Sequence, residues 1–303
     1  MFQVKKKNIV NTMPPHVFFF VSALFHYLGP ACAVLLFSSV SVLGVAWFRI
    51  ASAAAIFALW RRPWRIFAGR SWAQCRILLP LGIVLALMNA CFYLAISLIP
   101  LGTVGAIEFI GPIVLAALGA RTPRNISALV LAVGGGWLLT DVRFSGQPWG
   151  FIFAFANCAF FTFYVVLGHH LAQNGGATGI DRLGVAMLIA LVTMTPIGLS
   201  GALPAMGQPI LILAGIGVGI CSSVIPYVSD QLAMARLPRA TFALFLSLLP
   251  ASAALIGVIV LRQIPTLLEL AGLLLVAAGV ALHKESEAQQ KTIRKANKKQ
   301  GSQ

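Results

Sequence analysis

Long apolar runs recur along the whole chain, and the short segments between them hold Pro, Gly and charged residues. A bilayer core takes about 20 apolar residues per helix, so this pattern indicates membrane-spanning helices rather than the amphipathic helices of a soluble protein. Divided at Pro, Gly and charge clusters, the chain is predicted to contain ten spans. They are residues 14–36, 40–60, 77–97, 99–119, 125–141, 149–170, 183–202, 209–233, 239–261 and 265–283.

The composition supports an all-α membrane protein. Hydrophobic residues make up 59% of the 303 positions and charged residues only 10%, against about 25% charged in soluble domains. A net charge of +15 would suggest nucleic acid in a soluble protein, but here the basic residues lie between the spans, where they set topology. We therefore expect no nucleic-acid partner. The five cysteines are scattered singly, so no metal site is indicated.

The distribution of Lys and Arg predicts the orientation. If the N-terminus lies in the cytoplasm, only Arg143 and Arg262 fall in segments that face outward. Positive residues stay on the cytoplasmic side, so we expect an inner (cytoplasmic) membrane protein with both ends inside. Residues 1–13 would form a cytoplasmic N-terminus and residues 284–303 a basic cytoplasmic tail near anionic lipid.

An internal repeat divides the predicted spans into two halves. Residues 231–250 align with residues 93–112, and both prolines of the first segment recur in the second. A comparable apolar helix follows each segment. The chain is therefore predicted to hold two five-helix repeats, residues 14–145 and 146–283.

Because five is an odd number, the second repeat must enter the membrane from the opposite side. The turn after the third span should then face outward and be uncharged, and the equivalent turn after the eighth should face inward and be basic. Leu98 is replaced by Arg236 and Leu101 by Arg239 at the aligned positions, as this expectation requires. Inverted repeats around a site at the midplane are typical of secondary transporters.

Charged side chains within a span cost roughly 2.5–3.5 kcal/mol each and call for a reason. Glu108 lies halfway along the fourth span, and Pro112 deprives its carbonyl of a helical partner. It is either a group that binds protons or amines, or a structural carboxylate paired with Arg49 or capped by a hydroxyl. Arg49, deep in the second span, would pair with an acid or contact a substrate carboxylate.

Further candidates come from polar and aromatic clusters within the spans. Alternatives for these residues are interhelical hydrogen bonds, or aromatic packing against lipid or core. The candidate substrate-binding or coupling residues are Glu108, Asp230, Arg49, Asn89, Tyr93, Tyr227, Phe161 and Tyr164, and the helix-breaking prolines are Pro112, Pro226 and Pro250.

Two segments resemble a known family. "YLAISLIPLGTVGAIEFIGPIVLAALGARTPRN" and "IPYVSDQLAMARLPRATFALFLSLLPASAALIGVIVL" are similar to the two EamA-type repeats of the drug/metabolite transporter superfamily, in particular its threonine and homoserine exporter branch. The pattern P-L-G-x-x-x-x-x-E-F-x-G-P around Glu108 is the most specific part. The resemblance implies ten helices, a central cavity open alternately to each side, and proton-coupled efflux of small amino acids.

The chain departs from that branch at two points and agrees at a third. Leu249 stands where such exporters tend to have an acid before the proline aligned with Pro250, and "LRQ" at 261–263 replaces a common Gly-Glu. Asp230 falls where the branch tends to keep an acid.

The resulting hypothesis is a secondary active transporter that exports small neutral amino acids or related metabolites, by proton antiport. No ATP-binding loop is present, so an ion gradient would drive it. The alternative is a transporter of another solute, such as a nucleoside, a sugar or a lipophilic cation, working as an importer or facilitator. No catalytic constellation is spaced for an enzyme, and we expect no cofactor. The partners would be the small-molecule substrate, protons and membrane lipid; the oligomeric state stays undetermined.

Overall fold

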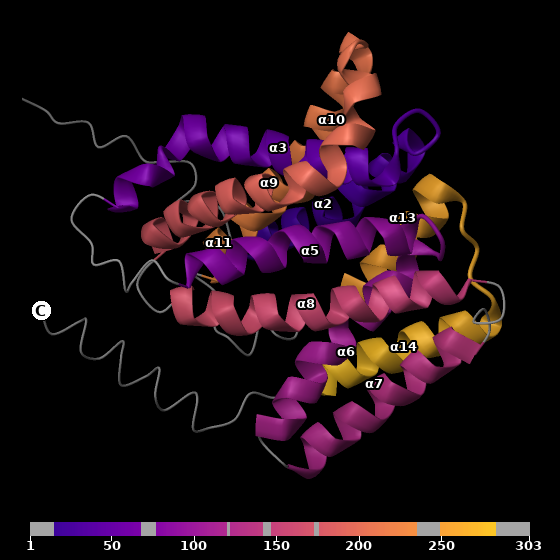
Figure 1. Ribbon diagram of the computed structural model, residues 1–303. Helices are drawn as coiled ribbons and strands as arrows, with labels where there is room; N and C mark the ends of the chain where they lie inside the picture. Colours follow the sequence, from indigo (N-terminus) through magenta and orange to yellow (C-terminus); the bar gives the residue numbers. More distant parts are fainter. Residues whose placement is uncertain are drawn as a thin grey trace, which may run out of the picture.

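The computed structural model describes residues 15–67, 77–119, 122–141, 147–172, 176–234 and 249–282. Within these ranges the chain is helical and contains no strand. The elements are α2 (Pro15–Leu36), α3 (Val42–Arg61), the 3-10 turn η1 (Pro63–Phe67), α5 (Leu78–Ile96), α6 (Leu101–Gly119), α7 (Pro123–Asp141), α8 (Pro148–Ala172), α9 (Gly176–Met206), α10 (Pro209–Gly219), the π-helix η2 (Ile220–Val224), α11 (Ile225–Met234), α13 (Leu249–Leu261) and α14 (Leu267–Leu282) (Figure 1).

Each of the ten predicted spans has its helical counterpart in the described residues, because α10, η2 and α11 form one continuous segment. The main difference is α9, which has 31 residues where the sequence predicts 183–202. Charged Asp181 and Arg182 suggested an end to the span, yet the helix continues through them and Asp181 pairs with Arg61 of α3. The first part of the predicted ninth span, residues 239–248, lies outside the described residues.

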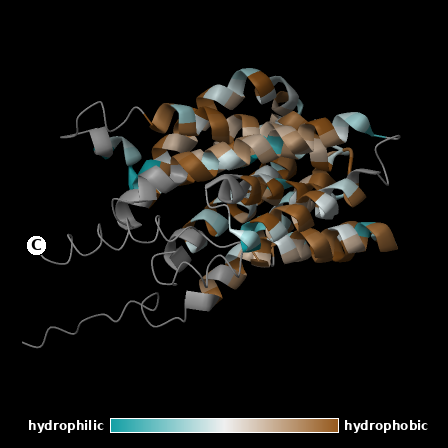
Figure 2. Cartoon of the chain, turned by 90° about the horizontal axis from the view of Figure 1, so that it is seen from below, coloured by the Kyte–Doolittle hydropathy of each residue, from teal (hydrophilic) through white to brown (hydrophobic). Residues whose placement is uncertain are grey.

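Length and composition fit a membrane. Five helices of the described part are long and apolar enough to cross a bilayer, and four shorter helices are also apolar. Many large apolar side chains are exposed, and much of the helical chain is coloured as hydrophobic in Figure 2. On α7, Ile126, Val130, Val133 and Trp137 recur at helical spacing and are all at least half exposed. The chain is therefore an all-α membrane protein whose exposed apolar surface faces lipid.

The start and end of α3 follow from local chemistry. The Ser41 hydroxyl accepts a hydrogen bond from the Gly44 N–H at 3.1 Å, as an N-cap does. At the other end Arg62 adopts the left-handed conformation, with φ of 47°, and its N–H bonds to the Ala58 carbonyl. Pro63 then prevents continuation of the helix. These limits fix the helix that carries Arg49.

The contacts between helices are largely symmetric: most contacts of a helix in the first half with a helix in the second have an equivalent when the two five-helix halves are interchanged. The second helix of each half, α3 and α9, pack against one another, and so do the fifth helices, α7 and α14 (Figure 1). The contact of α5 with α8 corresponds to that of α11 with α2, and the contact of α6 with α8 to that of α13 with α2. The first helix of each half, α2 or α8, therefore packs against the third and fourth helices of the other half.

Close helix contacts depend on glycine. A β-carbon added at Gly135 of α7 would lie 2.6 Å from the carbonyl oxygen of Gly272 on α14, so only glycine fits there. Small residues let helix backbones approach in a membrane, where packing rather than the hydrophobic effect drives association. The α7–α14 pair is thereby held at backbone contact.

Candidate functional site

Glu108 is buried in the middle of α6, with 3% of its surface exposed. The Asn157 amide of α8 donates a hydrogen bond to Glu108 Oε1 at 3.2 Å. The second carboxylate oxygen, Oε2, has no hydrogen-bond partner among the described residues. The helix continues through Pro112 to Gly119, so the proline removes one backbone hydrogen bond without ending α6. The sequence thus places an incompletely satisfied acid inside the bundle.

Arg49 is also buried, with 5% exposed, and binds η2 rather than an acid. Its Nε donates to Ser223 Oγ and its Nη2 to the Ser222 carbonyl, both at 2.9 Å. The Tyr93 ring lies beneath the guanidinium, 5.5 Å from its centroid. Because a guanidinium carries five N–H donors, Arg49 keeps donors for a further acceptor.

The proline of α11 explains why Arg49 binds a backbone carbonyl. Pro226 stands four residues after Ser222 and has no N–H to offer its carbonyl. Around it the helix widens into the π-helix Ile220–Val224, in which the Ile225 N–H bonds to the Ile220 carbonyl. Such π-bulges are frequent at functional sites. Arg49 replaces the missing donor, so the charge is coupled to an irregular segment of the opposite half.

The structure separates the two charges that the sequence left as a possible pair. In the part of the chain that is described, no ion pair joins Arg49 to Glu108; the ion pair found there links Arg61 and Asp181 at 2.7 Å, near the surface. The ion pair that the sequence offered as one role for Glu108 is therefore not formed between these two side chains in this structure. Glu108 and Arg49 are thus two buried ionisable side chains on different helices of the bundle, each with its own hydrogen-bond partners.

Three of the predicted aromatic residues, Phe161, Tyr164 and Tyr227, form a continuous series with Phe109 between α6, α8 and α11. Phe109 packs edge-on against Phe161, with 5.7 Å between the ring centroids, and Phe161 stacks on Tyr164 with a centroid distance of 6.1 Å. The ring centroids of Tyr164 and Tyr227 lie 6.5 Å apart. Phe109 directly follows Glu108. The series therefore connects the acid to the helix segment that carries Pro226.

The remaining predicted residues are less central. Asn89 is buried, but its amide donates to the Leu85 carbonyl of its own helix at 2.7 Å. Asp230 belongs to α11, and its side chain lies outside the described residues, so its prediction is untested. Pro250 is buried in α13, close to where the described residues resume at Leu249.

Two contributors, Tyr27 and Asn157, escaped the sequence analysis. Asn157 is fully buried and stands within an aromatic stretch, where a lone amide was itself a signal. Tyr27 of α2 is fully buried, and its hydroxyl lies next to Gly105, one turn before Glu108. Ser222 and Ser223 contribute to the site only because the π-helix turns them toward Arg49.

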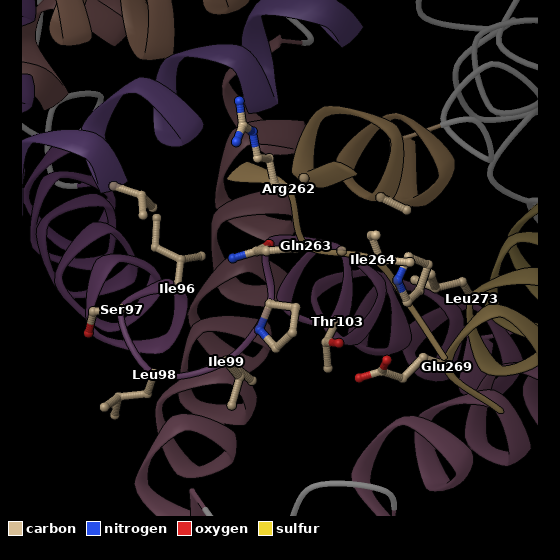
Figure 3. A pocket seen from close by; sticks show the side chains of 16 residues that line it. Ile96, Ser97, Leu98, Ile99, Thr103, Arg262, Gln263, Ile264, Glu269 and Leu273 are labelled. Atoms are coloured by element: carbon tan, nitrogen blue, oxygen red, sulfur yellow. The ribbon is translucent and has the colours of Figure 1, made fainter. Parts of the chain in front are cut away.

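A separate cavity of about 450 Å³ opens at the end of the bundle that topology predicts to face outward. It lies between the α5–α6 turn, α6 and the α13–α14 linker, and Thr103, Gln263 and Glu269 are among its lining residues (Figure 3). Gln263 Oε1 accepts a hydrogen bond from the Leu101 N–H at 3.0 Å and so ties the linker to α6. The volume suits a small metabolite.

Comparison with known proteins extends these observations. Residues 148–283 match the model of the EamA-like transporter family. The chain is 32% identical over 275 residues to "Threonine/homoserine exporter RhtA" of Salmonella typhimurium (strain SL1344), covering 88% of this chain and 90% of that protein. The protein of the same name from Escherichia coli (strain K12) is 34% identical over 252 residues, covering 81% and 82%.

A solved crystal structure shares the fold, with a TM-score of 0.54 and 18% identity, covering 89% of this chain and 97% of the other. At that identity the likeness concerns the fold alone. The similarity to the exporters spans nearly the whole of each chain, and it agrees with the ten helical segments and the buried polar centre. The chain therefore belongs to the EamA-like transporters of the drug/metabolite transporter superfamily, among which it resembles the threonine/homoserine exporters.

Proposed function

We propose that the protein exports small neutral amino acids of the threonine and homoserine type from the cytoplasm by proton antiport. It would act in the cytoplasmic membrane with both termini inside. The observation that carries this proposal is the pair of buried ionisable side chains, Glu108 and Arg49, which form no ion pair with each other. A zwitterion supplies an ammonium for one and a carboxylate for the other.

The energetics of burial support this assignment. A buried charge without a counter-ion costs several kcal/mol, so a structure that keeps two of them apart needs a reason. Arg49 is already positioned by Ser223 and the Ser222 carbonyl, and its remaining donors suit a carboxylate, which arginine can bind with two parallel hydrogen bonds. Glu108 retains one free oxygen for a cation. Binding of an amino acid would recover part of both costs.

Proton coupling follows from competition at one group. If Glu108 takes up either a proton or the substrate ammonium, but not both, each turnover exchanges one for the other. The buried position of Glu108 within α6 supports this role, because ionisable residues inside a membrane bundle are costly and mark substrate pathways or proton relays. Removal of the Glu108 carboxylate should therefore abolish transport driven by a pH gradient.

Alternating access would use the two halves, residues 14–145 and 146–283. The correspondence between helix contacts, such as α5 with α8 and α11 with α2, supports two related units. Exchange of their conformations would close one end and open the other. In this proposal the cavity near Gln263 is an outer vestibule on the export path.

The alternative cargoes fit less well. A carrier of lipophilic cations needs an anionic aromatic site without an arginine, whereas the guanidinium of Arg49 lies over Tyr93 within the bundle. A nucleoside or a sugar carries neither an ammonium nor a carboxylate, so its recognition would use neither of the two buried side chains. The positions of Arg49 and Glu108 therefore favour a zwitterionic substrate.

Transport by everted membrane vesicles tests the proposal. Vesicles that contain the full chain would be acidified inside, and uptake of radiolabelled threonine, homoserine, serine and alanine compared with uptake of a nucleoside and a sugar. Amino-acid uptake that collapses when a protonophore removes the pH gradient supports proton-driven export. Uptake confined to the nucleoside or the sugar, or unchanged by the protonophore, contradicts it.

A further inference from the structure

Three buried polar atoms with no hydrogen-bond partner in the described residues belong to neighbouring helices. They are Glu108 Oε2 on α6, Asn157 Oδ1 on α8 and the Tyr27 hydroxyl on α2. All three side chains are nearly or fully buried. Each unsatisfied atom carries a free-energy cost that a native structure does not retain without cause.

The hydrogen bond between Asn157 and Glu108 fixes which atoms are left over. An ionised carboxylate can only accept, so the amide presents its Nδ2 to Glu108 Oε1. Asn157 Oδ1 is therefore left as an acceptor beside the carboxylate. One residue pair from two helices thus provides two acceptors, Oδ1 and Oε2, next to each other.

Tyr27 brings the third group from α2. A β-carbon on Gly105 would lie 3.1 Å from its hydroxyl oxygen, and Gly105 and Glu108 are neighbours on α6 because they stand three residues apart. Tyr27 also lies within electrostatic range of Glu108. The absence of a side chain at Gly105 leaves the room in which the hydroxyl reaches α6.

We propose that Glu108 Oε2, Asn157 Oδ1 and the Tyr27 hydroxyl form a cradle for a primary ammonium group. The proposal rests on the proposed function and specifies which part of the amino acid these helices recognise. A primary ammonium has three N–H donors, and the cradle offers three acceptors from three helices. The carboxylate supplies the negative charge and accepts one hydrogen bond, and each of the two neutral groups accepts one further hydrogen bond from the ammonium.

Because the site has three acceptors, it selects ligands by the number of N–H donors on their nitrogen, which charge alone would not do. Each methyl group on the nitrogen removes a donor and leaves one buried acceptor unsatisfied. Sites built to bind an N–H or O–H group reject analogues that lack it far more strongly than apolar pockets reject an extra methyl. The cradle therefore discriminates primary from secondary and tertiary amines, and most strongly against a quaternary one.

Competition for binding measures this selectivity. Purified full-length protein in detergent would bind radiolabelled L-threonine in the presence of unlabelled L-threonine, N-methyl-L-threonine or N,N-dimethyl-L-threonine. The cradle predicts that each methyl group weakens competition about tenfold or more, since a hydrogen bond to a charged group is lost each time. Equal competition by the three compounds overturns the cradle.

Tyr27→Phe is the variant that removes one acceptor and leaves the packing volume. It should abolish the penalty for the first methyl group, so that L-threonine and N-methyl-L-threonine compete within about twofold. Tyr93→Phe is the matched control, because Tyr93 is equally buried but lies at Arg49. It should keep the discrimination whatever its effect on overall affinity. Loss of discrimination in both variants, or in neither, contradicts the assignment.

A second readout does not depend on which amino acid is carried. Thermal unfolding of the purified protein would be followed in methylammonium, dimethylammonium and tetramethylammonium chloride at equal ionic strength. A ligand that binds the folded state raises the Tm, so methylammonium should raise the Tm of the wild type most. In Tyr27→Phe, two acceptors remain, and methylammonium should lose its advantage over dimethylammonium.

The two readouts separate the cradle from the proposed function. Stabilisation by methylammonium that is lost in Tyr27→Phe supports the cradle. Absence of amino-acid transport together with that result would refute the proposed function and leave the cradle standing. Amino-acid transport with the three ammonium salts equally effective refutes the cradle alone and leaves water as the partner of these atoms.

Discussion

Asn157 donates a hydrogen bond of 3.2 Å to Glu108, and this bond joins α8 of one half of the chain to α6 of the other. Both side chains are withdrawn from solvent. The amide holds one carboxylate oxygen in place and leaves the second available. The bond thus orients the acid on which the proposed coupling depends.

Replacement of Glu108 by Gln should abolish uptake driven by a pH gradient in everted vesicles, because the amide neither ionises nor takes up a proton. The side chain keeps nearly the same size, so the variant should elute from a sizing column as the wild type does. Asp181→Asn is the control: it removes the surface ion pair with Arg61, worth about 0–1 kcal/mol, and should retain transport. Gradient-driven uptake that persists in Glu108→Gln would show that Glu108 is structural.

Asn157→Leu should lower transport at least tenfold while the protein remains folded, because Glu108 Oε1 then loses the donor that positions it. Phe155→Leu, at a position of α8 that is 45% exposed, is the comparison for a general effect of altering this helix. Initial rates and surface abundance would be measured together. A rate that falls only in proportion to abundance would argue against a positioning role for Asn157.

Arg49→Lys should raise the KM for amino acids by about tenfold or more, because an ammonium cannot bind a carboxylate with the two parallel hydrogen bonds of a guanidinium. It should also lower the free energy of unfolding by about 1–3 kcal/mol if the Ser222 carbonyl is left without a donor. Arg61→Lys, at the C-terminal end of α3, serves as the control. An unchanged KM would place the substrate carboxylate elsewhere.

Gly135→Ala should destabilise the protein by about 1–3 kcal/mol, because its new methyl group would meet the Gly272 carbonyl of α14. Gly134→Ala at the adjacent position is the matched control, since an added β-carbon there has no neighbour within 4 Å. That change should be neutral or stabilising by up to about 1 kcal/mol, the gain in helix propensity. Thermal unfolding in detergent would compare the two, and equal effects would contradict the observed α7–α14 packing.

The sequence alone determined the membrane class and the positions of the spans, because the bilayer requires long apolar helices and leaves their pattern visible along the chain. It also identified Glu108 and Arg49, since a charge inside an apolar run is conspicuous. The length of α9 was underestimated because the charged residues at its start suggested an end, whereas Asp181 is accommodated by Arg61 on another helix.

Only the tertiary structure decided which polar groups meet. The sequence offered an ion pair between Arg49 and Glu108, but the π-helix before Pro226 presents a carbonyl and a hydroxyl to Arg49, and Asn157 reaches Glu108 from a helix 49 positions away. Tyr27 joins them because Gly105 leaves space for its hydroxyl. Hydrophobic periodicity specifies which residues enter the membrane, whereas partners among the buried polar groups depend on helix rotation and backbone irregularities, which packing between distant segments sets.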